Sequence, residues 1–493
     1  MADERDDNQF RAARLAKLAE LRKLGCDPYP SAFARDAEAH ELEARYAKLA
    51  PGEETRDSVK VAGRIRAIRN SGMFIDLYDS SGKIQIFSHK EHLPPETLAL
   101  VKLLDLGDII GVEGVVRRTP RGELTVNSRQ VSVLSKALLP LPEKFHGLAD
   151  LETRYRQRYL DLIMSEESRA TLRRRSQIVA VLRRLLLERG FLEVETPMLH
   201  TIPGGASAKP FTTHHNALDL ELYLRIAPEL HLKRLLVGGL SEKIFEINRN
   251  FRNEGISPRH NPEFTSLELY QAYVDYRAMM ELAETLIAGA AQEVLGTTRI
   301  NYAERSIELA APWPRRSMAE LVQERTGIDF LAIANDIDAR QEARRLGVEL
   351  PDSVGWGRAL EAAFAATVEA DLVGPVHVVG FPREISPLAK GDPADARLTE
   401  RFETYINGWE VANAFSEIND PLDQRARFEA QMRARALGDE EAQHLDEDFV
   451  TALEYGMPPA GGLGIGIDRL AMLLTDSPSI RDVIAFPTMR PRS

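Results

Sequence analysis

The chain has almost no cysteine, and it lacks long apolar runs. Its 493 residues contain a single cysteine, Cys26, which excludes an internal disulfide framework and zinc sites of the Cys₄ or Cys₂His₂ kind. No uninterrupted apolar run reaches the roughly 18 residues of a membrane-spanning helix, and the charged N-terminus has no apolar signal-peptide segment. These absences predict a cytoplasmic protein without a membrane-spanning segment.

The common phosphate-binding loops are absent as well. No GxxxxGK[ST] sequence occurs, and the glycine-rich segment GGLGIGIDR (461–469) has a GxGxG pattern without the acidic residue that follows a Rossmann fingerprint. Bound phosphates would therefore have to be held by arginines. The glycines allow either tight backbone packing or close approach of a ligand. Arg469 begins a helix, where a cation is unfavourable unless an anion lies nearby.

Positive charge is scarce overall but is concentrated in one segment. The chain has 63 Lys and Arg against 75 Asp and Glu, for a net charge of −12, which argues against nonspecific nucleic-acid binding by the whole chain. Val59 to Lys136 carries twelve basic and eight acidic residues, so that its net charge is +4 and the remainder carries −16. This distribution favours a small module that faces nucleic acid, attached to an acidic body.

The same segment reads as a small β-barrel. Five short runs of β-forming residues between 59 and 139, separated by Gly- and Pro-containing turns, predict an OB-type barrel. Such a barrel either packs only against the rest of the protein or stacks single-stranded bases on its aromatic residues. A basic amphipathic helix over 10–25 either docks on a neighbouring element or contacts RNA. The candidate nucleic-acid-binding residues are Arg64, Arg69, Phe74, Gln85 and Phe87.

The rest of the chain mixes strands and helices without a βαβ repeat. Adjacent strands with helices grouped apart predict an α+β fold with an antiparallel sheet. Alternating prolines near 140 indicate an extended linker. The expected parts are an N-terminal helical extension (1–58), the barrel (59–139), a linker (140–150) and a catalytic domain (151–493) with a mainly helical insertion at about 317–370.

A polar strand–loop–strand segment at 243–272 is the first candidate site. KIFEINRNF and PEFTSLELY form its strands, and the loop between them is rich in Gly, Ser, Pro and Asn. Period two places Phe264, Glu268 and Tyr270 on one face. Arginine offers a planar fork for phosphate or carboxylate, and phenylalanine offers a stacking surface for a base. The nearby polar residues are Arg252, Glu254, Arg259 and His260; the alternative is a solvated charged hairpin.

A second hairpin carries two acidic residues. Asn407-Gly408 is a strong turn signal, and it would pair Tyr405 with Glu410 and make Glu403 a diagonal neighbour of Glu410. Two such carboxylates repel each other unless a cation such as phosphate-bound Mg²⁺ lies between them; otherwise they are exposed. Strict alternation puts Asn413, Phe415 and Glu417 on the opposite face, so a shared site requires a bulge near 411–412.

Four segments in this order resemble class II lysyl-tRNA synthetases. They are LPLPEKFHGLADLETRYRQRYLDL (139–162), FLEVETP (191–197, motif 1), RNFRNEGISPRHNPEF (249–264, motif 2) and GLGIGIDR (462–469, motif 3). The resemblance implies a six-stranded antiparallel catalytic sheet flanked by helices, an N-terminal OB-fold anticodon-binding domain and a homodimer formed through the motif 1 region. It also implies ATP, L-lysine and tRNA(Lys) as substrates and Mg²⁺ as the cofactor.

The resemblance also assigns roles to individual residues. Arg252 and Arg469 would be catalytic: Arg252 would contact the α-phosphate and the lysine carboxylate, and Arg469 would hold the outer phosphates together with His260. Glu254 would read the adenine amino group, and Phe264 would stack on the ring. Glu403 and Glu410 would hold Mg²⁺. The lysine-binding residues would be Gly205, Glu229, Tyr270, Asn413, Phe415 and Glu417, and the anticodon would contact Arg64, Phe74 and Gln85.

Three alternatives remain open at this point. An aspartyl- or asparaginyl-tRNA synthetase of the same subclass would need a cationic side chain facing an aspartate substrate, whereas Glu229 and Glu417 supply carboxylates. A lysine ligase acting on a protein would resemble the catalytic domain alone. A catalytically silent RNA-binding paralogue would not need Arg252, Glu403, Glu410 and Arg469.

Overall fold

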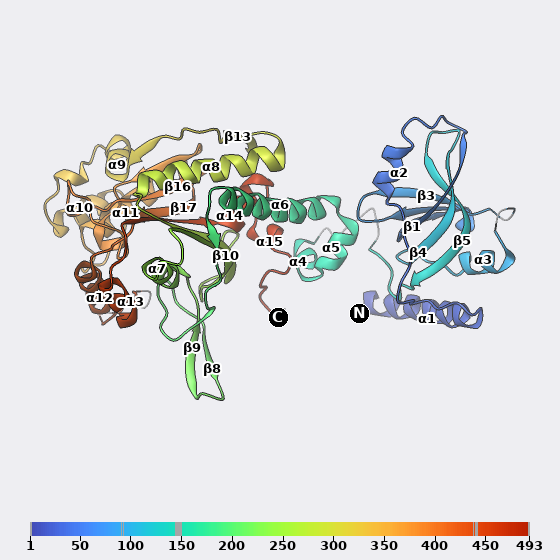
Figure 1. Cartoon of the computed structure of the whole chain (residues 1–493), viewed down its shortest axis with the longest axis horizontal. Helices are drawn as coiled ribbons and strands as arrows, with labels where there is room; N and C mark the ends of the chain where they lie inside the picture. The colour runs from blue at the N-terminus through green and yellow to red at the C-terminus, as the bar shows by residue number, and fades with distance from the viewer. Residues whose placement is uncertain are drawn as a thin grey trace. The chain divides into compact units, whose positions relative to one another are not determined.

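The computed structural model describes residues 2–89, 91, 93–142, 150–436, 438 and 442–491. The chain forms two compact units, Met1–Ala149 and Asp150–Ser493 (Figure 1). Residues 143–149 of the predicted linker lie outside the described residues. Each unit has its own hydrophobic core, as a chain of this length requires.

The first unit contains a closed five-stranded barrel. Its strands follow the order β1-β2-β3-β5-β4, and β3 and β5 pair in parallel, which confirms the predicted OB-type architecture. The strands are β1 (Glu54–Arg69), β2 (Phe74–Tyr78), β3 (Lys83–Phe87), β4 (Ile109–Arg118) and β5 (Leu124–Ser135), and the helices are α1 (Ala2–Lys23), α2 (Ala39–Arg45), η1 (Asn70–Gly72) and α3 (Pro95–Val101).

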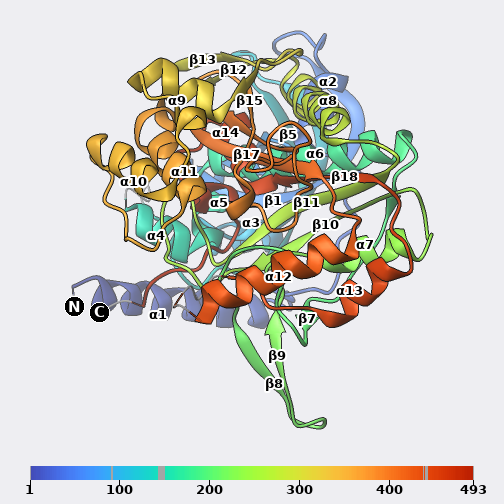
Figure 2. The same cartoon turned by 90° about the vertical axis from the view of Figure 1, so that its left-hand side faces the viewer.

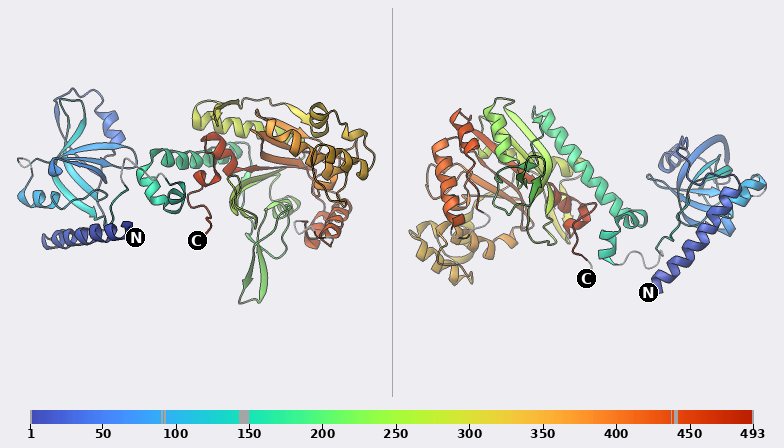
Figure 3. Two further views of the ribbon diagram at one scale, coloured as in Figure 1. Left: turned by 180° about the vertical axis from the view of Figure 1, so that it is seen from behind. Right: turned by 90° about the horizontal axis from the view of Figure 1, so that it is seen from below.

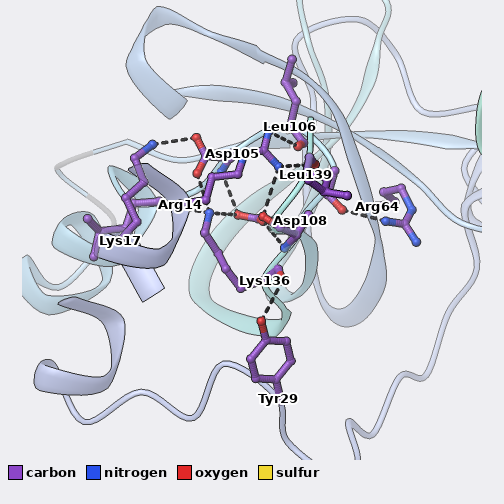
Figure 4. A network of polar contacts seen from close by, with 12 residues as sticks. Arg14, Lys17, Tyr29, Arg64, Asp105, Leu106, Asp108, Lys136 and Leu139 are labelled. Carbon is purple, nitrogen blue, oxygen red and sulfur yellow. Dashed lines mark hydrogen bonds and ion pairs between the residues drawn. The ribbon is translucent and has the colours of Figure 1, made fainter. Parts of the chain in front are cut away.

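A buried polar network attaches α1 to the barrel (Figure 4). The guanidinium of Arg14 donates to the carbonyl oxygens of Leu139 (2.7 Å) and Leu106 (3.0 Å). The fully buried ammonium of Lys136 lies 2.6 Å from Asp105 and 2.8 Å from Asp108. Of the three leucines on α1, Leu18 and Leu21 are buried and Leu15 is exposed, as is Leu24 just after the helix. One face of this helix is therefore buried against the barrel, as the docking alternative predicted.

The second unit is built on one large mixed sheet. Its strands lie in the order β14-β15-β16-β17-β18-β11-β10-β6. The six strands from β15 to β10 are antiparallel, as predicted, but the short edge strands β14 and β6 pair in parallel, so the sheet has eight strands rather than six. These strands are β14 (Arg315–Ser317), β15 (Val376–Val379), β16 (Arg401–Ile406), β17 (Trp409–Ser416), β18 (Ala460–Gly466), β11 (Glu263–Ala272), β10 (Lys243–Phe251) and β6 (Leu192–Glu193).

Alternation along the central strands gives the sheet two different faces. Leu267 and Leu269 of β11 join a core formed with the long helices α6 (Glu166–Glu188) and α8 (Tyr276–Leu295) and with α14 (Ile467–Leu474). Glu268 and Tyr270 point to the opposite face, where α7 (Glu229–Val237), α12 (Pro421–Ala436) and α13 (Glu447–Glu454) form a smaller cluster. Figure 2 shows α8 on one side of the sheet and α12 and α13 on the other.

A helical segment with its own small core lies beside β15. It contains α9 (Met318–Thr326), η2 (Phe330–Ala332), α10 (Asp336–Arg345), α11 (Trp356–Thr367) and η3 (Glu369–Asp371), which pack around Phe330, Trp356 and Phe364. The hairpin β8–β9 (Thr212–His215 and Leu220–Leu224) projects from the second unit (Figure 3). The remaining elements are α4 (Leu151–Arg156), α5 (Arg158–Met164), β7 (Leu199–His200), β12 (Arg299–Tyr302), β13 (Arg305–Glu308), η4 (Arg383–Ile385) and α15 (Ile480–Val483). Among the helices of the described ranges, none is both long enough and apolar enough to cross a bilayer.

Candidate active site

One cavity lies on the polar face of the large sheet. Its volume is about 700 Å³, which is large enough for a nucleotide together with a small second substrate. Residues from β10, β11, β16, β17, β18 and the first turns of α7 and α14 line it. The structure brings together every catalytic, ATP, lysine and metal residue predicted from the sequence: Gly205, Glu229, Arg252, Glu254, His260, Phe264, Tyr270, Glu403, Glu410, Asn413, Phe415, Glu417 and Arg469.

A cation and an aromatic ring face each other at the start of the motif 2 loop. Asn250 pairs with Phe264 across β10 and β11, so Arg252 begins the loop beside that ring. The guanidinium carbon of Arg252 lies 5.0 Å from the ring centroid of Phe264. The Arg252 backbone N–H donates to the Pro262 carbonyl at 2.9 Å, which fixes the base of the loop. Phe264 thus offers a stacking surface, with a planar cation next to it.

Arg469 connects three segments at another part of the cavity. Its guanidinium donates to the carbonyl oxygen of Glu410 at 2.7 Å and to the carboxylate of Glu410 at 3.2 Å. Its other terminal nitrogen lies 3.3 Å from Nε2 of His260. Burial and the nearby Arg469 charge lower the pKa of His260, so the ring is neutral at neutral pH. Glu410 is therefore the anion that compensates a cation in the first turn of α14.

The hairpin of β16 and β17 contains the bulge that a shared site requires. Asn407 and Gly408 both have positive φ, 54° and 69°, as a type I′ turn demands. Tyr405 pairs with Glu410, whereas Thr404 pairs with Ala412, so Val411 is the extra residue. The predicted bulge near 411–412 is confirmed. It reverses the alternation and lets residues on both sides of Val411 face the cavity.

The two carboxylates on this hairpin have different surroundings. Glu403 is buried, and its oxygens accept hydrogen bonds from Arg401 (2.6 Å) and from the hydroxyl of Tyr405 (2.7 Å). Burial raises the pKa of Glu403 to about 7, and the negative charge of Glu410 acts in the same direction. Within the described residues, no group of three or more His, Cys, Asp and Glu is arranged around a metal position. Protein sites for Mg²⁺ commonly use one or two carboxylates plus substrate phosphates, and the Glu403–Glu410 pair fits that donor set.

A buried carboxylate pocket occupies a further part of the cavity. Glu229 begins α7, and Glu417 follows β17; both side chains are buried. Oε1 of Glu417 has no hydrogen-bond partner among the described residues. A Cβ atom at Gly462 would lie 2.0 Å from that oxygen, so only glycine fits beneath it. Burial raises the pKa of Glu417 to about 8 and also raises the pKa of Glu229. Both groups are therefore suited to receive a buried cation.

Lys233 is the residue of this pocket that the sequence analysis missed. It lies one helical turn after Glu229 on α7, and its Nζ is 2.5 Å from Oε1 of Glu229. It also forms an ion pair with Oε2 of Glu417, and its side chain is fully buried. The i, i+4 spacing of Glu229 and Lys233 was the available signal. Lys233 does not line the cavity, although both of its partners do.

The aromatic candidates on the barrel are partly assembled. Phe74 and Phe87 pair across β2 and β3 with ring centroids 5.0 Å apart, and the guanidinium of Arg117 lies 5.5 Å from the centroid of Phe87. Gln85 lies two residues before Phe87 on the same face of β3. Arg64 is engaged elsewhere, because it donates to the Gly107 carbonyl at 2.8 Å. Arg117 is a basic residue beside these rings that was not predicted from the sequence.

Comparison with known proteins identifies the class to which this fold and site belong. Residues 150–490 match the family described as tRNA synthetases class II (D, K and N). Residues 59–134 match the OB-fold nucleic acid binding domain. The chain therefore belongs to the class II tRNA synthetases of this subgroup.

Relatives across nearly the full length narrow the class further. A protein of Sinorhizobium medicae (strain WSM419) named lysine–tRNA ligase is 57% identical over 97% of this chain and 96% of its own length. Lysine–tRNA ligases of Carboxydothermus hydrogenoformans and Rhizobium etli (strain CIAT 652) are 55% and 53% identical. They cover 98% and 99% of this chain, and 99% of each relative is matched.

Proposed function

We propose that the protein activates L-lysine with ATP, forming lysyl-adenylate and pyrophosphate, and then transfers lysine to the 3′ end of tRNA(Lys). The observation that carries this proposal is the coexistence in one cavity of two unlike sites. One is the Arg252–Phe264 pair, which suits a purine nucleotide, and the other is the Glu229–Glu417 pocket. Lysine is an amino acid with two ammonium groups, and two carboxylates match them.

The charge arrangement favours lysine over aspartate or asparagine. Lys233 is the cation nearest to the two carboxylates, but it lies behind them and does not reach the cavity surface. A substrate side chain in this pocket would therefore meet Glu417, which lines the cavity and whose Oε1 has no hydrogen-bond partner among the described residues. An aspartate side chain there would place like charges together in a buried site, which is strongly unfavourable.

The chemistry needs no side-chain base. The carboxylate of lysine is itself the nucleophile toward the α-phosphorus of ATP, so catalysis rests on alignment of the two substrates and on charge neutralisation. In our assignment, Arg252 contacts the α-phosphate and the lysine carboxylate, while Arg469 and His260 bind the outer phosphates. Glu254 reads the adenine amino group. Gly205 and Glu229 take the α-ammonium group, Glu417 and Tyr270 take the ε-ammonium group, and Asn413 and Phe415 complete the pocket.

Glu403 and Glu410 are the proposed ligands of Mg²⁺. The ion would neutralise charge on the ATP phosphates. The two carboxylates lie on one hairpin beside the proposed phosphate-binding arginine, Arg469. Burial and the charge of Glu410 raise the pKa of Glu403, and a divalent cation beside the two carboxylates would favour their ionised forms.

ATP–pyrophosphate exchange with each amino acid in turn tests the proposed function. Lysine alone should support exchange. Exchange driven by aspartate or asparagine would move the protein to another specificity within its family. Absence of exchange with every amino acid, in folded protein, would favour a catalytically silent paralogue.

We also propose that the protein acts in the cytoplasm, because ATP, lysine and tRNA(Lys) are substrates of translation.

The barrel should be dispensable for amino-acid activation but needed for efficient tRNA charging. A chain that starts at Asp150 retains all residues of the cavity and should keep lysine-dependent exchange. It should aminoacylate tRNA at least about tenfold less efficiently, because each stacked base is worth about 1–3 kcal/mol. Exchange and aminoacylation assays measure the two activities, and the Phe74→Ala, Phe87→Ala double variant is the full-length comparison. Loss of exchange in truncated protein shown to be folded would contradict this division.

A homodimer through the motif 1 region is the proposed assembly. Leu187, Leu192 and Leu199 expose about half of their surface along the end of α6 and the strands β6 and β7. In the proposed dimer, a second copy of the chain would cover them. Sedimentation equilibrium should give twice the chain mass, and Leu187→Asp with Leu192→Asp should shift the mass to that of a monomer. A monomeric wild-type protein would refute the assembly.

A further inference from the structure

We propose that Lys233 is a positioning residue, a buried counter-cation that favours the ionised forms of Glu229 and Glu417 and engages one oxygen of each, so that the other can face the two ammonium groups of the substrate. This inference rests on the proposed lysine specificity, and it adds a residue that does not touch the substrate. It starts from the position of Lys233 between two carboxylates that come from different elements.

The geometry places Lys233 behind the pocket rather than in it. Its Nζ is 2.5 Å from Oε1 of Glu229 and contacts Oε2 of Glu417. The side chain is fully buried, and the cavity is lined by both carboxylates but not by Lys233. Oε1 of Glu417 has no hydrogen-bond partner among the described residues. One oxygen of each carboxylate is thus engaged by Lys233, and both carboxylates line the cavity from the side that a substrate would occupy.

Aromatic rings complete the walls around this ammonium. Nζ of Lys233 lies 5.3 Å from the ring centroid of Phe415 and 6.0 Å from that of Tyr270. Such rings stabilise a desolvated cation without offering a competing hydrogen-bond acceptor at their faces. The ion pairs with Glu229 and Glu417 are therefore the strong polar contacts that hold the ammonium group of Lys233 in place.

The charges that face this cluster explain why a counter-cation is needed. Glu229 and Glu417 contact a common nitrogen, so two negative charges lie close together in a buried site, where each disfavours ionisation of the other. Lys233 opposes the increase in the pKa of both carboxylates. The other titratable or charged groups that act on the cluster are Glu268 and Tyr270 from β11 and Arg401 from β16.

Removal of this cation should raise the pKa of both carboxylates further, so that a smaller fraction of them is ionised at neutral pH. A protonated carboxylate no longer forms an ion pair with an ammonium group, so lysine binding would weaken. Raising the pH would ionise the carboxylate again and restore part of the affinity. A residue that served only packing would instead produce a loss that does not change with pH.

The test measures lysine kcat/KM in ATP–pyrophosphate exchange between pH 6 and 9.5, in the full chain. Lys233→Met should lower lysine kcat/KM by about tenfold or more at pH 7, and the deficit should shrink toward pH 9. This corresponds to an upward shift of at least about one unit in the controlling pKa. Lys233→Arg keeps the charge and should keep the wild-type profile. The substrate's own amino groups titrate identically for all variants, so the ratio to wild type cancels them.

Lys136→Met is the matched control. Lys136 is also fully buried between two carboxylates. It belongs to the first unit, whereas every residue that lines the cavity belongs to the second. Its replacement should leave the pH profile for lysine unchanged. If Lys233→Met does not give folded protein, Lys233→Gln keeps a hydrogen-bond donor without the charge and should show the same pH-dependent loss.

Two results would overturn the inference. One is a loss in Lys233→Met or Lys233→Gln that is equal at every pH, and the other is no loss at all. Lysine-dependent exchange by the wild-type protein tests the proposed function, whereas the variant-to-wild-type ratio tests Lys233. The two failures are therefore distinguishable.

Discussion

Glu403→Gln or Glu410→Gln should lower kcat/KM for MgATP by about 100-fold or more, because loss of one group that organises transition-state charge typically costs about 10²–10³-fold. Both side chains line the cavity beside the proposed phosphate-binding residues. If both hold one metal site, the double variant should be little worse than either single variant. Exchange assays at limiting Mg²⁺ measure this effect.

The free protein provides a second readout for Glu403. Its folded-state pKa of about 7 lies above the ordinary 4.5, so the native state binds the extra proton and stability falls as pH rises through that window. Glu403→Gln should therefore reduce the loss of Tm between pH 5 and pH 8.

A matched control and two contrary outcomes complete this experiment. Glu246→Gln, which neutralises a buried carboxylate outside the cavity, controls for general destabilisation. Full additivity of the Glu403→Gln and Glu410→Gln losses would indicate independent roles. Wild-type activity in either single variant at limiting Mg²⁺ would refute the metal site.

Glu417→Gln should raise the KM for lysine roughly 10- to 150-fold, because a hydrogen bond to a charged group contributes about 1.5–3 kcal/mol. Glutamine keeps the shape above Gly462 but removes the negative charge that faces the ε-ammonium group. The KM for ATP should change little, since the Arg252–Phe264 site is formed by other residues.

The lysine KM of the wild-type protein should also depend on pH, and that of the Glu417→Gln variant should not share this dependence. The pKa of Glu417 is about 8, so its ionised fraction grows as pH rises from 6 to 8, and the lysine KM of the wild-type protein should fall over that range. Glutamine does not titrate, so the variant should lose this contribution. Kinetics at several pH values measure both effects; an unchanged lysine KM in the variant would remove Glu417 from the pocket.

Local sequence signals were sufficient for the barrel strands and for the β16–β17 hairpin. Asn407-Gly408 specifies its turn by the positive φ of both residues, and the requirement that Glu410 and Glu417 face one site predicted the bulge now seen at Val411. The five barrel strands followed from alternating β-forming residues and turn residues. These features depend on neighbours in the chain, so a single sequence carries them.

Other features depended on residues distant in sequence. The edge strands β6 and β14 contain only two and three residues, too few for an alternation pattern to specify their parallel pairing with the longer strands beside them. Arg64 carries no signal that its guanidinium bonds to the Gly107 carbonyl, since that contact depends on how the barrel closes.

The sequence by itself determined the class of this protein, because its motifs place arginine, phenylalanine and carboxylates on known strands and turns. Only the tertiary structure decided that two of these carboxylates, Glu229 and Glu417, share one buried counter-cation, Lys233. Glu229 and Lys233 are one turn apart on α7, but Glu417 reaches them from the end of β17. The ionisation of a buried carboxylate depends on every charge within a few ångströms, and those distances exist only after the sheet and α7 have packed together.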